Sequence, residues 1–371
     1  MSSADEIARR AQEISARAQR IAEDASDSDA LREELDHLDS ELAQLDEEQR
    51  RLDDEMLDRG NVASSEPTRE LDPPVWTEQL ADIVSDVTER LGSLAGGWPF
   101  RANDTIEKSV EVANELPVVI ESRGGSIKVR SGAPGSVDVT AELFAPTKVL
   151  LDEMVLIAEN DGAQVNVRAH WPEHRRGRRV RLTVTVPPGT SVRAQTSGGS
   201  VTVTDTRGPA SASTRGGSIT IDGARGDVDA RTKGGSVRVT DHDGAVHAST
   251  MGGSVHVGGV LRGAVDASTA GGSIRIEGAE GATVSASTSG GSIDVRGRLS
   301  GYSRIRTAGG SVSVTIPPDS QLHVDGKGSS SSSDFADLDV ARGRITGTLG
   351  DGHEGTVEFR TSGGSVSLRK S

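Results

Sequence analysis

The sequence predicts an all-β, single-stranded β-solenoid of parallel strands, with coils of 18–19 residues and an N-terminal α-helical coiled-coil segment. Two observations support this fold class: a short repeat between residues 198 and 315, and heptads near the N-terminus. Successive copies of the repeat begin 18, 18, 18, 19, 19 and 19 residues apart. So short a fixed period is typical of a solenoid, in which each coil buries its apolar face against its neighbours. The copies open with Gly-Gly-Ser at Gly198, Gly216, Gly234, Gly252, Gly271, Gly290 and Gly309.

Each copy contains the pattern of two strands. An apolar–any–apolar triplet such as Val201 to Val203 follows Gly-Gly-Ser and indicates a strand with one buried face. A turn with glycine follows, and then a second alternating run with small inner residues, such as Ala248 and Thr250. Large side chains thus face small ones across a thin interior. We expect the glycine pairs to form corners with positive φ, and the extra residue of the longer copies to lie in a turn at residues 258–263.

Composition agrees with a solenoid and limits the function. Aromatic residues are 2% and hydrophobic residues 33% of the chain, which is little for a globular core of 371 residues. The net charge of −15 argues against nonspecific nucleic-acid binding. The absence of cysteine excludes disulfides and thiolate metal sites. The first residues resemble no signal peptide, and no run of 18 apolar residues occurs, so we expect a soluble, cytoplasmic protein without a membrane span.

The N-terminal hundred residues are predicted to be helical. Residues 1–60 carry alanine and isoleucine, then leucine, at heptad positions, which predicts a coiled coil. It either assembles a homo-oligomer through residues 4–56, which we favour, or folds into an intramolecular helical hairpin. Residues 61–102 are a polar linker followed by a short amphipathic helix at 75–94. The acidic polar face of that helix favours a cap on the solenoid over contact with a membrane.

Residues 103–371 are predicted to form the β-solenoid domain, with regular coils at 198–315 and irregular ones on either side. The apolar segment 149–158 is expected to be a strand. Residues 165–170 and 180–186 have the pattern of a hairpin. The last strand ends in Arg369 and Lys370, charges that would discourage strand addition at an edge.

Two outward rows are the first candidates for a functional surface. The first row, in order, is Ser211, Asp229, His247, Asp266, Ser285 and Arg304. Stacking places Asp229, His247 and Asp266 side by side, with an imidazole between two carboxylates. Such a trio suits acid–base chemistry or a weak metal site, although a solvated face with alternating charges is the more common meaning. The other row has a cationic stretch that suits an acidic glycan, the chain's own acidic segment, or solvent. Its members are Thr202, Thr220, Arg238, His256, Arg275, Asp294 and Ser313.

The most basic segment is the loop at residues 170–179. It suits an anionic polymer or a protein partner, or is simply an exposed turn. The residues that would form this interaction surface are Trp171, Arg175, Arg176, Arg178 and Arg179. No phosphate-binding loop, catalytic triad or calcium-binding repeat occurs in the sequence, so no cofactor, metal, nucleic-acid partner or enzymatic activity is predicted.

Three stretches resemble the bacterial putative-adhesin family, a domain of unknown function predicted to form β-solenoids. They are residues 196–203 (Thr-Ser-Gly-Gly-Ser-Val-Thr-Val), 184–189 and 359–366. The resemblance covers about residues 103–371 and implies an adhesin-like role without catalytic residues. We therefore expect a non-enzymatic structural or interaction protein that presents a solenoid surface on a coiled-coil oligomer. The alternatives are a self-assembling cytoplasmic scaffold like the bactofilins, and a polysaccharide-binding or glycan-active solenoid.

Overall fold

The computed structural model describes residues 102–112, 116–172 and 177–371. The coiled coil predicted for residues 1–60 and the helix predicted at 75–94 lie outside the described residues. The described chain divides into two compact units. The smaller contains residues 102–104, 143–154, 171–172 and 177–179, and the larger contains the rest. We describe each unit by itself.

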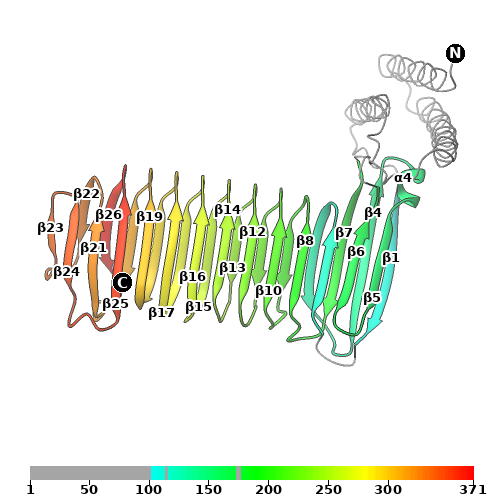
Figure 1. Cartoon of the computed structure of the whole chain (residues 1–371), viewed down its shortest axis with the longest axis horizontal. Coiled ribbons are helices and arrows are strands. Elements are labelled where there is room, and N and C mark those ends of the chain that lie inside the picture. Colours follow the sequence, from blue (N-terminus) through cyan, green and yellow to red (C-terminus); the bar gives the residue numbers. More distant parts are fainter. Residues whose placement is uncertain (1–101, 113–115, 173–176) are drawn as a thin grey trace, which may run out of the picture. The chain divides into compact units, whose positions relative to one another are not determined.

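The larger unit is all β and consists of stacked coils, each of which gives one strand to sheet A and one to sheet B (Figure 1). The stacking is parallel and in register, as the repeat predicts. One long strand, β17 (Ile274–Thr288), runs through both sheets. The other strands of regular coils in sheet A are β9 (Val201–Thr204), β11 (Ile219–Asp222), β13 (Val237–Thr240), β15 (Val255–Leu261), β18 (Ile293–Leu299) and β20 (Val312–Ile316). Those in sheet B are β10 (Ala210–Thr214), β12 (Val228–Thr232), β14 (Val246–Thr250), β16 (Ala264–Thr269) and β19 (Gly301–Thr307).

The core is a narrow stack of large and small apolar side chains. Ile219 and Ile221 of sheet A are fully buried, as are Ala212 and Ala230 of sheet B. This confirms the predicted pairing of large residues with small ones. The register between β15 and β17 shifts after Gly258 and is regular again where β16 pairs with β17 in sheet B, so the extra residue of the longer coils lies in the predicted turn.

The corners differ from the prediction. Of the glycines in the seven regular Gly-Gly-Ser copies, only Gly199 has a positive φ, +86°. The second glycine of each pair is needed for a different reason, which is close stacking. A Cβ atom on Gly217 would lie 2.1 Å from the carbonyl oxygen of Gly199 in the preceding coil, and one on Gly235 would lie 2.3 Å from that of Gly217. Any side chain there would push the coils apart.

Two hydrogen-bonded ladders join each corner to the preceding one. The buried Thr250 hydroxyl donates to the Gly235 carbonyl at 2.7 Å and accepts from the Gly253 amide at 3.3 Å. The same two bonds recur at Thr214, Thr269, Thr288, Thr307 and Thr361. In the second ladder the Ser254 amide donates to the Ser236 hydroxyl at 3.2 Å, and neighbouring coils repeat this bond. The inner threonine and the serine of the repeat are therefore structural.

Near the N-terminal end of the stack, one coil is inserted between two later ones. In sheet B, β2 (Val118–Ser122) lies between β6 (Val165–His170) and β8 (Val192–Thr196). In sheet A, β3 (Gly125–Ser131) lies between β7 (Arg179–Val186) and β9. The hairpin predicted from residues 165–170 and 180–186 is therefore wrong, because β6 and β7 belong to different sheets. The antiparallel partner of β6 is β5 (Val155–Asn160). The remaining strands here are β4 (Ser136–Ala145), which pairs with β7, and β1 (Ala102–Glu111), which pairs with β4.

The C-terminal end is interleaved in the same way. Strand β25 (Gly355–Thr361) lies between β19 and β21 (Leu322–Lys327), and β26 (Ser365–Lys370) lies between β20 and β22 (Ser330–Ser333). The last strand is thus not an edge, which corrects the expectation for Arg369 and Lys370. Two antiparallel strands follow β21 in sheet B, namely β24 (Arg344–Thr348) and then β23 (Asp339–Ala341).

The smaller unit contains the short helix α4 (Lys148–Asp152). The prediction of a strand over residues 149–158 is therefore wrong in its first half and right for β5. Thr147 is the N-cap, and its hydroxyl accepts a hydrogen bond from the Leu150 amide at 3.3 Å. Threonine at this position stabilises the first turn of a helix and overrides the β propensity of the apolar residues that follow.

Candidate functional site on the outer face of sheet B

The predicted row on sheet B is present. Asp229 of β12 lies opposite His247 of β14, which lies opposite Asp266 of β16. Alternate residues of each strand are buried, and the parallel register aligns the remaining outward residues of neighbouring strands in this row. The row continues to both sides as predicted, from Ser211 to Ser285 and Arg304.

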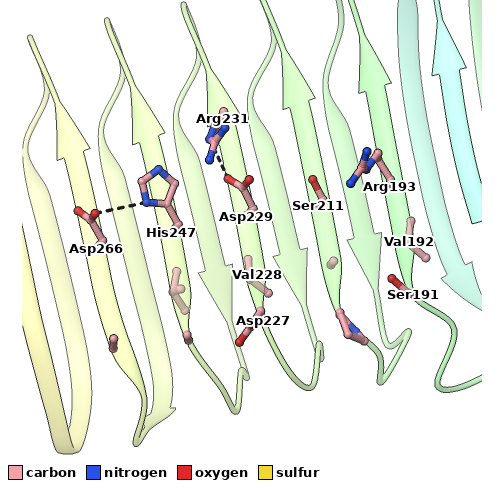
Figure 2. Close-up of a pocket in the computed structure, with 15 residues that line it drawn as sticks. Ser191, Val192, Arg193, Ser211, Asp227, Val228, Asp229, Arg231, His247 and Asp266 are labelled. Atoms are coloured by element: carbon pink, nitrogen blue, oxygen red, sulfur yellow. Dashed lines mark ion pairs between the residues drawn. The ribbon is translucent and has the colours of Figure 1, made fainter. Parts of the chain in front are cut away.

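The histidine contacts only one of its two neighbouring carboxylates. His247 Nδ1 lies 3.4 Å from Asp266 Oδ2, whereas Asp229 Oδ1 lies 2.9 Å from Nε of Arg231 (Figure 2). All four side chains are 39–60% exposed. Charge pairs this open to water contribute little free energy. The imidazole is therefore not held between two carboxylates, as an acid–base trio would require.

These side chains surround a hollow of about 520 Å³ that spans strands β8 to β16. Arg193, Asp227 and Asp229 line it together with His247 and Asp266 (Figure 2). Its lining mixes polar and apolar side chains and carries both signs of charge. Among the described residues, no three His, Cys, Asp or Glu side chains are arranged to hold a metal ion. This geometry suits reversible contact with a polar ligand.

The predicted row on sheet A is also present, and its cations are balanced by acids. His256 lies opposite Arg238 on one side and Arg275 on the other. Its Nε2 is 3.6 Å from Glu277, and Arg275 is 3.7 Å from Asp294. Burial, with a smaller effect of Arg238, lowers the pKa of His256. This face does not present the net positive charge that the sequence row alone indicates.

The basic loop is only partly available for binding. Trp171 is buried, with 7% of its surface exposed. The Arg178 side chain is also buried: its Nε donates to the Leu150 carbonyl at 2.8 Å, and its Nη2 pairs with Glu153. Arg179 is exposed. Arg175 and Arg176 lie outside the described residues.

A cluster around Glu358 of β25 was not among the predicted sites. Arg306 Nη2 and Arg360 Nε each lie 2.8 Å from its carboxylate, and the Tyr302 hydroxyl donates to it. The bond from Tyr302 is the main cause that holds the pKa of Glu358 below its ordinary value, helped by Arg306 and Arg360 and opposed by burial. The predicted row ended at Arg304 because it followed consecutive copies. The detectable signal was the late copy at residues 359–364, which aligns with residues 305–310.

Stacked parallel coils with interleaved ends define a β-solenoid domain. The sequence profile of the family described as Toastrack DUF4097 matches residues 117–369. The chain therefore belongs to this family, which confirms the resemblance to a putative-adhesin domain of unknown function. Within residues 102–112, 116–172 and 177–371, no helix is both long and apolar enough to cross a membrane.

Several solved structures are similar, all at low sequence identity. A putative adhesin from Bacteroides fragilis is 12% identical, with a TM-score of 0.37 over 72% of this chain and 97% of its own. A putative lipid binding protein from Parabacteroides distasonis is 10% identical, with a TM-score of 0.38 over the same shares. A putative adhesin from Parabacteroides merdae is 8% identical, with a TM-score of 0.28 over 72% of this chain and 96% of its own. No curated protein matched the sequence.

Proposed function

We propose that this chain is a non-enzymatic interaction protein whose β-solenoid presents fixed rows of side chains to a binding partner. The observation that carries this proposal is the in-register stacking, which repeats outward positions at about 4.8 Å from coil to coil. Buried threonine ladders hold the backbone of the coils in place, so little backbone order has to be gained on binding. The role is adhesin-like in the sense that the family resemblance implies.

We propose further that residues 4–56 assemble several copies of the chain. Weak contacts at one solenoid become strong when several solenoids engage the same partner. Light scattering after size exclusion tests this with the full chain and with a chain that begins at Asn103. We expect a defined oligomer for the first and a monomer for the second. A monomer in both cases would remove oligomerisation. The cytoplasmic location expected from the sequence belongs to the same proposal, and recovery in a membrane or external fraction of cells would contradict it.

Self-assembly like that of the bactofilins is the first alternative, and the strands near both ends of the stack argue against it. End-to-end growth would continue the parallel register from one molecule to the next. In sheet B that register stops at β5 near one end and at β24 and β23 near the other, which are all antiparallel. If the mass of the chain that begins at Asn103 grows with concentration, this alternative replaces the proposal.

A glycan-active solenoid is the second alternative, and the hollow beside His247 is the place where its chemistry would occur. The single contact between His247 and Asp266 is open to solvent and does not form an acid–base trio. Incubation with polysaccharides and measurement of new reducing ends tests this directly. Reducing ends that disappear in His247→Ala would show that the chain is an enzyme, contrary to our proposal.

A further inference from the structure

Four basic side chains form a continuous outward row across the C-terminal part of sheet B. We call it the cation row: Arg306, Arg360, Lys327 and Arg344. Arg306 of β19 lies opposite Arg360 of β25, which lies opposite Lys327 of β21. Lys327 in turn lies opposite Arg344 of β24. Like charges directly opposite each other destabilise a sheet, so this arrangement has an energetic cost.

The regular coils avoid this arrangement. From β8 to β17 in sheet B, no lysine or arginine lies opposite another. Arg193 lies opposite Ser211, and Arg231 lies between Ser213 and Ser249. The cation row is therefore a local departure from the pattern of the same sheet.

Carboxylates neutralise the row only in part. Glu358 contacts Arg306 and Arg360, and it lies 3.7 Å from Arg304 beside the row. Asp325 lies 3.0 Å from Arg360 and 3.9 Å from Arg344. Lys327 makes no ion pair with any residue of the described ranges. Asp339 of β23 belongs to the same neighbouring row as Arg304, Glu358 and Asp325. The four cations of the cation row and Arg304 thus face three carboxylates, which leaves two net positive charges on a chain whose total charge is −15.

Arg306 and Arg360 are held in place, and both are open to solvent. Arg306 and Arg360 are 47% and 46% exposed, and Arg344 is 59% exposed. The carboxylate of Glu358 is nearly buried and fixes two guanidinium groups at once. Half-exposed Tyr302 lies next to this arrangement, with Arg304 stacked 4.9 Å from the centre of its ring.

We propose that the cation row binds a linear polysaccharide that carries carboxylate groups. Four adjacent strands span about 14 Å, which suits an extended chain rather than a single small anion. Guanidinium groups bind carboxylates through paired hydrogen bonds. A nucleic acid is less suitable, because single strands bind through a series of aromatic side chains on which the bases stack, and aromatic residues are 2% of this chain. The inference rests on the proposed function, to which it adds a ligand class and a site.

The test measures binding of the full chain to polygalacturonate by calorimetry at low salt. The informative variant is Lys327→Gln with Arg344→Gln, since these exposed side chains make the fewest internal contacts. The matched control is Arg215→Gln with Lys233→Gln, which removes one arginine and one lysine from exposed corners of the regular coils, away from both the cation row and the hollow beside His247. We expect about tenfold weaker binding in the first variant and little change in the control, with affinity that falls as salt rises. A neutral dextran should not bind.

Three results would overturn the inference: no binding of polygalacturonate by the unaltered chain, equal losses in the two variants, or tighter binding of polyuridylate than of polygalacturonate. The second result would mean that net charge alone controls binding, and the third would point to a nucleic acid. Circular dichroism of both variants verifies that they fold. Light scattering of the same samples separates the two proposals, because a negative binding result with an intact oligomer leaves the proposed function standing.

Discussion

His242 should make the solenoid sensitive to mild acid. Its side chain is 1% exposed in the turn between β13 and β14, and neither ring nitrogen has a hydrogen bond of standard geometry. Burial lowers the pKa of His242, opposed more weakly by the backbone of Ala245, Ala224 and Gly244 and by the charge of Asp243. The other charged groups of this turn and of the turn before it are Asp227 and the pair formed by Arg225 and Asp241, which lie 3.9 Å apart.

The sign and the size of the effect follow from linkage. Because the pKa is lower in the folded state, folding favours the neutral imidazole. Its contribution to stability is complete above about pH 6.5, the ordinary value of histidine, and is lost as the pH falls from there towards the folded pKa. The loss cannot exceed about 1.4 kcal/mol per pH unit. Between pH 7.5 and 5.5 we therefore expect the free energy of unfolding to fall by up to about 1.4 kcal/mol, or about 2–4 °C in melting temperature.

Thermal melts of the unaltered chain and of His242→Ala over this pH range provide the assay. The equivalent position in the preceding coil is Ala224, which is also buried, so alanine fits at this place in the fold. His256, whose pKa is lowered as well, contributes with the same sign, so only the difference between the two proteins measures His242. His247→Ala on the outer face is the control, since it leaves the buried imidazole in place. Equal pH dependence of His242→Ala and the unaltered chain would refute the argument.

Three further predictions concern the corners and the coils. Gly217→Ala should lower the free energy of unfolding by about 3 kcal/mol or more, because its Cβ would lie 2.1 Å from a carbonyl oxygen. The adjacent Gly216→Ala has open space around its Cβ and should change the free energy of unfolding by less than about 0.5 kcal/mol. Equal effects of the two variants in denaturant melts would contradict the stacking argument. Thr250→Val should cost about 1–3 kcal/mol through the lost ladder bonds, and outward-facing Ser249→Ala almost nothing. Deletion of residues 234–251, one complete repeat, should leave a folded chain with a cooperative melt, and a molten product would show that coils are not interchangeable.

The regular coils could be predicted because their signals are local. Alternation at Val255 and Val257 and glycine at a fixed period are visible within a single copy, so strand positions, inner residues and the outward rows follow from the sequence. The role of the glycines was misjudged. A positive φ is the common reason for glycine, and only the distance between Gly217 and the preceding coil shows that space is the requirement here.

The ends and the cation row could not be predicted because they depend on pairings between strands that are far apart in the sequence. The late copy at residues 359–364 aligns Arg360 with Arg306, but nothing in the sequence indicates that this copy returns into the stack between β19 and β21. The row through His247 was predicted correctly, yet its contacts were not. Asp229 pairs with Arg231 of its own strand and not with His247, and the spacing of residues in the sequence does not predict which of the two it contacts.

The interleaved coils at both ends bear on how such a domain changes length during evolution. A coil added after β26 would have no free neighbour in sheet A, because β26 already lies between β20 and β22. A coil duplicated between β10 and β18 would need only the contacts that every internal repeat already makes. We therefore expect coils to be gained or lost among the regular repeats, while the interleaved coils at the two ends are retained unchanged. The number of internal repeats then acts as a ruler that sets the separation of the two ends in steps of about 4.8 Å.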